Sequence, residues 1–148
     1  MKNILFVCTG NSARSIIAEA IVNTYFKDKY KAFSAGSNPS GKINDDIKNY
    51  LITKNMDVSN CYSKDFRKFI NEEINMHLVV TVCSNANNEV CPIWPKKNEI
   101  IHWDIEDPVE RLNATNDINR KKYIVETTYK IIYKKINEQL NEIGRAHV

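Results

Sequence analysis

The chain has 148 residues, of which 43% are hydrophobic and 26% are charged, and this length and composition predict a single domain, 1–148, with enough apolar side chains to form a core. The formal net charge is only +3, and because Lys and Arg are mixed with Asp, Glu and Asn along the chain, nucleic acid is not expected as a partner. The N-terminus is apolar only over Ile4–Val7, which argues against a signal peptide or a membrane span, so we expect a cytoplasmic monomer that does not bind membranes.

Strand and helix patterns alternate through the first part of the chain. Asn3–Val7 is a short apolar strand that ends in a Gly-containing turn, and the stretch from Arg14 to about Lys29 has apolar residues at helical spacing. A second strand is predicted over Lys31–Ser34 and a second helix over Asn44–Asn55.

The alternation continues through the second part. The Val-rich run His77–Val82 predicts a buried strand that leads directly into Cys83. Glu99–His102 predicts a shorter strand, and Asp104–Pro108 a loop, because proline disfavours helix at the residue before it. Apolar residues then recur every three or four positions over Asp117–Ile143, which predicts a long amphipathic helix.

This order of elements predicts an α/β fold with an open parallel sheet flanked by helices, whose ligands bind beyond the carboxyl ends of the strands. Cys8, Cys83 and Asp107 each follow a predicted strand, so we expect one cleft to hold all three. Gly144–Val148 break the helical pattern, and we expect them to be a disordered tail or a remnant of cloning.

The most informative motif combines a cysteine and an arginine at Cys-x5-Arg spacing between a strand and a helix. Backbone N–H groups of such a loop and the helix N-terminus together bind a tetrahedral oxyanion, and Arg14 adds a planar fork for two oxygens. The same field favours the thiolate of Cys8, which we expect to be a nucleophile. Ser15 is expected to donate a hydrogen bond to this sulfur and Asn11 to brace the loop. The full motif is Cys8-Thr9-Gly10-Asn11-Ser12-Ala13-Arg14-Ser15.

This motif, with Phe6-Val7 before it and Ala18-Glu19-Ala20 after it, resembles the active-site loop of low-molecular-weight protein tyrosine phosphatases and of the arsenate reductases that share their fold. The loop alone does not separate the two families. Three later segments are similar to the thioredoxin-coupled arsenate reductases specifically: Val79–Cys83, Cys91–Pro95 and His102–Pro108. The resemblance extends from Asn3 to about Pro108, and it implies a four-stranded parallel sheet.

The resemblance also implies a set of roles. Cys8 is the nucleophile, Arg14 the oxyanion ligand and Asp107 the general acid, with Asp104 as the second choice of acid. Cys83 and Cys91 carry the oxidation away and end as a disulfide that thioredoxin, or a similar dithiol protein, reduces. The implied reaction is the reduction of arsenate to arsenite, with no tightly bound cofactor.

Two departures from the family pattern bear on these roles. The segment between Cys83 and Cys91 is one residue longer than the family pattern. Some members bind a monovalent cation beneath the loop, at positions that match Asn11, Glu19 and Ser34, but Lys64 stands where an acidic ligand is expected, and its ammonium group is a candidate to replace the cation.

Three other interpretations stay open from the residues. A protein tyrosine phosphatase would use Cys8, Arg14 and Asp107 and would not need Cys83 or Cys91, but the residues after Asp107-Pro108 lack the aromatic side chains that hold a tyrosyl ring. A structural zinc site with Cys83, Cys91, His77 and His102 has poor ligand spacing. A non-catalytic oxyanion or redox sensor leaves the acidic residue unexplained. The remaining cysteine, Cys61, has no evident partner and is expected to be structural.

Overall fold

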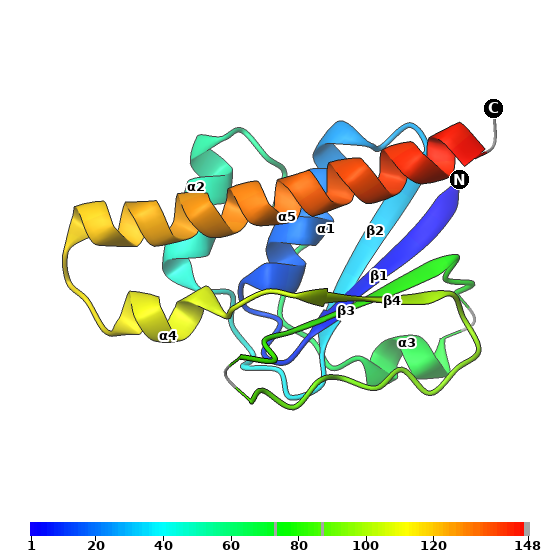
Figure 1. Cartoon of the computed structure of the whole chain (residues 1–148), viewed down its shortest axis with the longest axis horizontal. Coiled ribbons are helices and arrows are strands. Elements are labelled where there is room, and N and C mark those ends of the chain that lie inside the picture. The colour runs from blue at the N-terminus through cyan, green and yellow to red at the C-terminus, as the bar shows by residue number, and fades with distance from the viewer. Residues whose placement is uncertain (73, 87, 147–148) are drawn as a thin grey trace.

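The computed structural model describes residues 1–72, 74–86 and 88–146. Its centre is one parallel sheet of four strands in the order β2-β1-β3-β4, which confirms the predicted open α/β sheet. The strands are β1 (Lys2–Cys8), β2 (Tyr30–Gly36), β3 (Leu78–Cys83) and β4 (Ile100–Asp104). Because all four run in the same direction, their carboxyl ends meet at one edge of the sheet (Figure 1).

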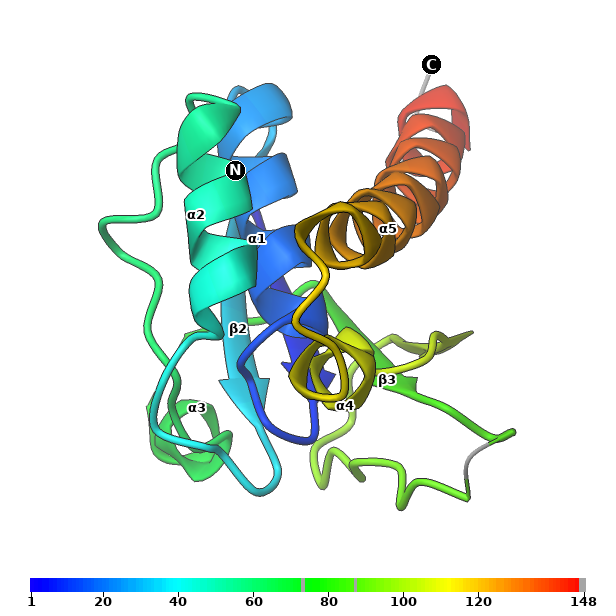
Figure 2. The same ribbon diagram turned by 90° about the vertical axis from the view of Figure 1, so that its left-hand side faces the viewer.

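Helices cover both faces of this sheet. Figure 1 shows α1 (Arg14–Tyr25), α2 (Asp45–Thr53) and α5 (Ile118–Ala146) on one face and the short α3 (Arg67–Asn71) on the other. The last helix, α4 (Pro108–Asn113), lies at the end where the loop between β1 and α1 is found (Figure 2).

The side chains of β1 alternate between the two faces and so define two cores. Ile4, Phe6 and Cys8 belong to the larger core with α1, α2 and α5, whereas Leu5 and Val7 belong to the smaller core beside α3. This alternation follows from the two-residue repeat of a strand, and burial on both faces explains the continuous apolar run of β1.

Helix α1 is enclosed from its first residue to Val22, and its last turn is partly exposed. Every residue from Arg14 to Val22 is buried, because α1 packs on the sheet and is covered by α2 and α5. The N-terminal turn of α1 and the loop before it are therefore fixed by packing against the sheet and the neighbouring helices.

Several element boundaries differ from the predictions. Helix α1 ends at Tyr25, not near Lys29, and β2 continues through Gly36, because its register with β1 runs to the pair Cys8 and Gly36. Helix α5 continues to Ala146, three residues beyond its predicted end at Ile143. Residues 147–148 of the expected tail or cloning remnant lie outside the described residues.

Two helices were not predicted. Helix α3 has only five residues, too few for a periodic pattern to mark it. Helix α4 begins at Pro108 with Asp107 as its N-cap, so the proline that was expected only to keep the preceding segment out of a helix is itself the first helical residue, where its missing N–H has no effect. Within the described part of the chain, no helix is both long and apolar enough to cross a membrane.

Candidate active site

The loop between β1 and α1 surrounds the sulfur of Cys8. The thiol is almost fully buried, with 1% of its residue surface exposed. Its Sγ lies 2.9 Å from Ser15 Oγ and accepts a hydrogen bond from the backbone N–H of Asn11 at 3.3 Å. Thr9, Gly10 and Ser12 lie at the partly exposed mouth of the loop, and Ala13 is buried beneath it.

Asn11 braces this loop from within. Its backbone has a positive φ of 48°, a conformation that asparagine adopts more readily than most residues. The side-chain amide donates to Ser15 Oγ at 2.7 Å and to Ser34 Oγ at 3.0 Å, and its carbonyl oxygen accepts from the Lys64 N–H at 2.9 Å. These bonds connect the loop to β2 and to the segment before α3.

The loop's own carbonyl oxygens are held on the outside by the segment after β2. Cys8, Thr9 and Gly10 accept hydrogen bonds from the backbone N–H groups of residues 37, 38 and 40 at 2.9 to 3.0 Å. A Cβ atom at Gly36 would lie 2.5 Å from the carbonyl oxygen of Thr9, so this close approach requires glycine. With the carbonyls outside, the N–H groups of the loop are left for the inside, the arrangement that binds an anion.

Arg14 is buried, and its guanidinium group binds a carboxylate that the sequence did not point to. Its two terminal nitrogens donate to the two oxygens of Glu89 at 2.7 and 2.6 Å, and one also donates to the carbonyl of Ile105 at 2.9 Å. Burial alone would lower the pKa of Arg14, but the bonds to Glu89 and the nearby charges of Cys8 and Asp107 raise it. Arg14 therefore stays cationic, and in this disulfide form its planar fork is occupied by the Glu89 carboxylate.

Asp107 is the acidic residue of its loop that lies beside Arg14. One carboxylate oxygen accepts from the Val109 N–H at 3.0 Å as the N-cap of α4, and the other lies 3.7 Å from Arg14. Asp104, the second choice of acid, instead accepts a hydrogen bond from the Asn85 N–H at 3.0 Å. The side chain of Asp107 is 42% exposed, so it is open to solvent.

Cys83 and Cys91 form a disulfide, with their Cα atoms 5.3 Å apart. By the alternation of β3, Cys83 faces the same side of the sheet as Val79, in the core beside α3, whereas Cys8 faces the α1 side. The structure thus brings Cys8, Arg14 and Asp107 together, as expected, but in this disulfide form Cys83 is turned to the other face.

Three of the four residues considered for zinc lie together: the ligand atoms of Cys83, Cys91 and His102 are within 4.8 Å of one another. His102 lies beside the disulfide, with Nε2 3.6 Å from Cys83 Sγ and Nδ1 3.1 Å from Thr81 Oγ1. His77 lies elsewhere, where its Nδ1 accepts from the Asn3 N–H at 3.1 Å. Cysteines bonded to each other lack the thiolates that zinc requires.

A buried polar cluster lies beneath the loop, at the positions matched to a monovalent cation site. Ser34 Oγ donates to Glu19 at 2.6 Å, and the Lys64 ammonium lies 3.5 Å from the same Ser34 oxygen and donates to the Tyr62 carbonyl at 2.6 Å. Burial raises the pKa of Glu19 and lowers that of Lys64. Burial and the charge of Glu19 also raise the pKa of Cys61, a free thiol, to about 12, so Cys61 is protonated at neutral pH.

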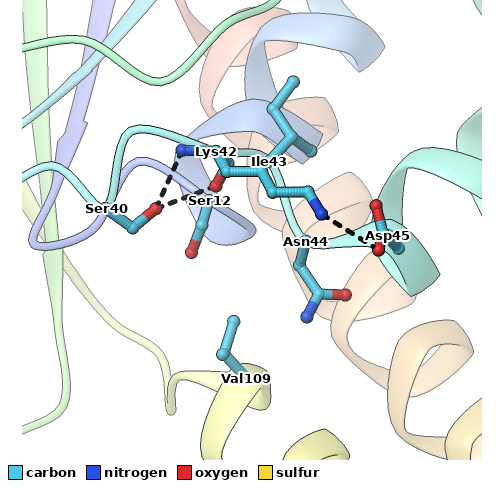
Figure 3. Close-up of a pocket in the computed structure, with 7 residues that line it drawn as sticks. All are labelled: Ser12, Ser40, Lys42, Ile43, Asn44, Asp45 and Val109. Atoms are coloured by element: carbon cyan, nitrogen blue, oxygen red, sulfur yellow. Dashed lines mark hydrogen bonds and ion pairs between the residues drawn. The ribbon is translucent and has the colours of Figure 1, made fainter.

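A shallow pocket of about 240 Å³ lies next to the loop, and Figure 3 shows its lining. Val109 lies across this pocket from Ser12 and Asn44, and the ion pair between Lys42 and Asp45 lies at one side. Its lining contains no aromatic side chain: it consists of Ser12, Ser40, Lys42, Ile43, Asn44, Asp45 and Val109.

Sequence reasoning missed Glu89 as a site residue. The extra residue between Cys83 and Cys91 was visible, but an acidic residue in an Asn-rich loop has no spacing that relates it to Arg14. Besides Arg14, the Glu89 carboxylate accepts from Thr9 Oγ1 at 2.5 Å and from the Ser84 N–H at 2.8 Å.

Comparison with known proteins shows the family and the fold of the chain. A family model described as low molecular weight phosphotyrosine protein phosphatase matches residues 3–146. An arsenate reductase of Bacillus cereus (strain 03BB102) is 40% identical over 107 residues, which cover 72% of this chain and 77% of that protein. A crystal structure of an arsenate reductase from Archaeoglobus fulgidus is 25% identical, with a TM-score of 0.65 over 90% of this chain and 98% of that chain.

A further solved structure shares the fold. It is a thioredoxin-dependent arsenate reductase from Corynebacterium glutamicum, which is 22% identical with a TM-score of 0.61, over 95% of this chain and 63% of that chain.

Proposed function

Because this chain belongs to the low molecular weight phosphotyrosine protein phosphatase family, we propose that it uses the oxyanion loop of that family to reduce arsenate to arsenite. The observation that carries the proposal is the Cys83–Cys91 disulfide, in a segment whose Glu89 contacts Arg14 and Thr9 of this loop. A phosphatase needs only Cys8, Arg14 and Asp107. A reductase must also supply two electrons to arsenate, and a pair of thiols supplies them by forming a disulfide.

The first step is the attack of the Cys8 thiolate on arsenic. The N–H groups of the loop and the Arg14 guanidinium bind the arsenate oxygens, and Ser15, 2.9 Å from the sulfur, stabilises the thiolate. Asp107 gives its proton to the departing oxygen, which leaves as water. The substrate-binding residues in this proposal are Thr9, Gly10, Asn11, Ser12, Ala13, Arg14 and Ser15.

Two thiol exchanges follow. The Cys83 thiolate attacks Cys8 Sγ, the electron pair of the sulfur–arsenic bond passes to arsenic, and arsenite leaves behind a Cys8–Cys83 disulfide. The Cys91 thiolate then attacks Cys83 Sγ and frees Cys8 as a thiolate. Because Cys83 faces the other side of the sheet in the disulfide form, the end of β3 must turn between these steps.

Thioredoxin or a similar dithiol protein is the proposed electron donor, and no bound cofactor is needed. The residues that flank Cys91 offer it a surface: Val90 is 85% exposed and Ile93 is 81% exposed. Exposed apolar side chains next to a disulfide are suited to transient contact with a reducing protein. We also propose that the chain works as a monomeric single domain in the cytoplasm, where such donors keep thiols reduced.

The polar cluster beneath the loop supports a related proposal. The Lys64 ammonium lies among Ser34, Glu19 and the carbonyl of Tyr62, so it takes the place of a monovalent cation there. The amide oxygen of Asn11 accepts from the Lys64 N–H, so one of its two acceptor positions is already used.

A phosphatase activity through a phosphocysteine on Cys8 is the second candidate, and the family model favours it. The pocket beside the loop argues for a small inorganic substrate, since Val109 and the polar residues around it give a tyrosyl ring no aromatic partner.

The deciding experiment measures NADPH consumption by the purified protein with thioredoxin and thioredoxin reductase, with and without arsenate. We expect turnover that depends on arsenate and disappears in Cys83→Ser, with Cys61→Ser as the control that retains it. If arsenate gives no turnover while phosphate monoester hydrolysis survives Cys83→Ser, the protein is a phosphatase and the reductase proposal is wrong.

A further inference from the structure

The carboxylate of Glu89 makes the set of contacts that an oxyanion bound to this site would need. Both of its oxygens are held by the fork of Arg14 at 2.7 and 2.6 Å. Thr9, at the mouth of the oxyanion loop, and the N–H of Ser84, at the end of β3, donate two further bonds. Only 17% of the side chain is exposed, and that of Arg14 is 1% exposed.

The hydrogen bonds to Glu89 stabilise its negative charge, which burial alone would disfavour. Burial would raise the pKa of Glu89, but the hydrogen bonds from Arg14 and Thr9 and the charge of Arg14 lower it to about 2. The carboxylate is therefore fully ionised at neutral pH, as an arsenate or phosphate ion would be. A bidentate pair of this kind is among the stronger polar contacts in proteins.

We propose that Glu89 is a positioning residue that replaces the oxyanion on Arg14 when the Cys83–Cys91 disulfide forms, so that the oxidised protein binds substrate and product more weakly than the reduced protein does. This inference rests on the proposed function, because it assigns Glu89 a place in the same thiol relay. In this proposal the Glu89 carboxylate competes with the oxyanion for Arg14.

The disulfide and the ion pair support each other through the chain. Glu89 is two residues before Cys91, and the N–H that binds its carboxylate belongs to the residue after Cys83. Closing the disulfide confines Glu89 close to Arg14 and raises its effective concentration there. In the reduced protein this constraint is absent, so a free oxyanion displaces Glu89 from Arg14 at a lower concentration than in the disulfide form.

The same coupling orders the steps of the relay. While an oxyanion occupies Arg14, Glu89 has no cation to bind. Once arsenite leaves, Glu89 reaches Arg14 and brings Cys91 toward Cys83. The exchange itself is balanced: the Cys91 thiolate, having given its proton to solvent, bonds to Cys83 Sγ while the Cys8–Cys83 bond breaks and Cys8 leaves as a thiolate.

The test measures the binding of inorganic phosphate by calorimetry to the full chain in its reduced and disulfide forms. We expect the disulfide form to bind phosphate about 10-fold or more weakly than the reduced form, the size of a typical coupling between two sites. In Glu89→Gln the two forms should bind equally well. Glu89→Asp, which keeps the charge but shortens its reach, should fall in between.

Glu99→Gln is the matched control. This substitution removes the same charge as Glu89→Gln, but Glu99 is exposed at the opposite end of β3 and β4. It should behave as the wild type, and unfolding temperatures should show that every variant folds. Equal phosphate binding by the two wild-type forms would overturn the proposal, as would a disulfide form of Glu89→Gln that still binds weakly. Loss of arsenate turnover with this phosphate pattern intact would refute the reductase function and leave the role of Glu89 standing.

Discussion

Lys64 places a positive charge in the buried polar cluster beneath the oxyanion loop. Glu19 is 4% exposed and Lys64 is 9% exposed, with Ser34 between them. Burial raises the pKa of Glu19, and the charge of Lys64 opposes this shift.

Replacing Lys64 by methionine should leave Glu19 buried without a cation. We expect Lys64→Met to lower the free energy of unfolding by about 2 kcal/mol at pH 8, the cost of stranding a buried polar group. Because the folded pKa of Glu19 is already raised above 4.5 and rises further in the variant, its protonated form supplies stability at low pH that is lost as the pH increases. The deficit should therefore shrink at pH 5.

Urea unfolding at both pH values measures this deficit. Lys42→Met, at a lysine whose side chain is 75% exposed, is the control and should change the stability little at either pH. A deficit that is the same at pH 5 and pH 8 would show that Lys64 contributes packing and not charge.

Helix α4 joins a structural and a chemical role in the residue that begins it. Asp107 caps the helix through the Val109 N–H and also lies beside Arg14. Pro108 at the first helical position fixes the direction in which the helix leaves the loop. The position of the Asp107 carboxylate is thus fixed by helix α4 as well as by the loop that precedes this helix.

Substituting Asp107 by asparagine separates these two roles. Asparagine caps a helix as well as aspartate, so the free energy of unfolding of Asp107→Asn should stay within about 0.5 kcal/mol of the wild type. It cannot donate the proton, so arsenate turnover should fall by about 100-fold or more. Asp104→Asn is the control for the neighbouring carboxylate, and full activity in Asp107→Asn with loss in Asp104→Asn would exchange the two assignments.

How far the sequence predicts the structure depends on the kind of signal each element carries. The four strands and the helices α1, α2 and α5 have apolar periodicity and were predicted, as was the loop from Cys8 to Ser15. Helix α4 was missed because Pro108 was weighed for its effect on the residue before it and not as a helix start. The contact between Glu89 and Arg14 joins residues 75 positions apart and depends on the path of a loop, which no local pattern encodes.

At the scale of the whole molecule, α5 closes the larger core. Ile132 and Ile136 are each 1% exposed, and both belong to the core with Phe6 and Trp103. The helix covers α1, which contacts the sheet on its other side. The stability of the domain should therefore depend on the inner face of α5, in either redox state of Cys83 and Cys91.

Adjacent isoleucines on α5 provide a matched test of this dependence. Ile132→Ala should lower the free energy of unfolding by about 3 kcal/mol, as large-to-small substitutions in a closed core do. Ile131→Ala removes the same atoms from a side chain that is 43% exposed and should cost much less. Denaturant unfolding of both variants, oxidised and reduced, measures the difference; similar losses in the two variants would mean that α5 is not the cover of this core.

The enclosure of α1 also has a consequence for folding. A helix that is buried from Arg14 to Val22 has no face suited to water, so it cannot persist in a partly assembled chain that lacks the sheet or α5. The oxyanion loop at its start becomes ordered only when the complete domain does. Every anion bound there is consequently a ligand of the native state alone, and its concentration shifts the folding equilibrium of the entire chain by mass action.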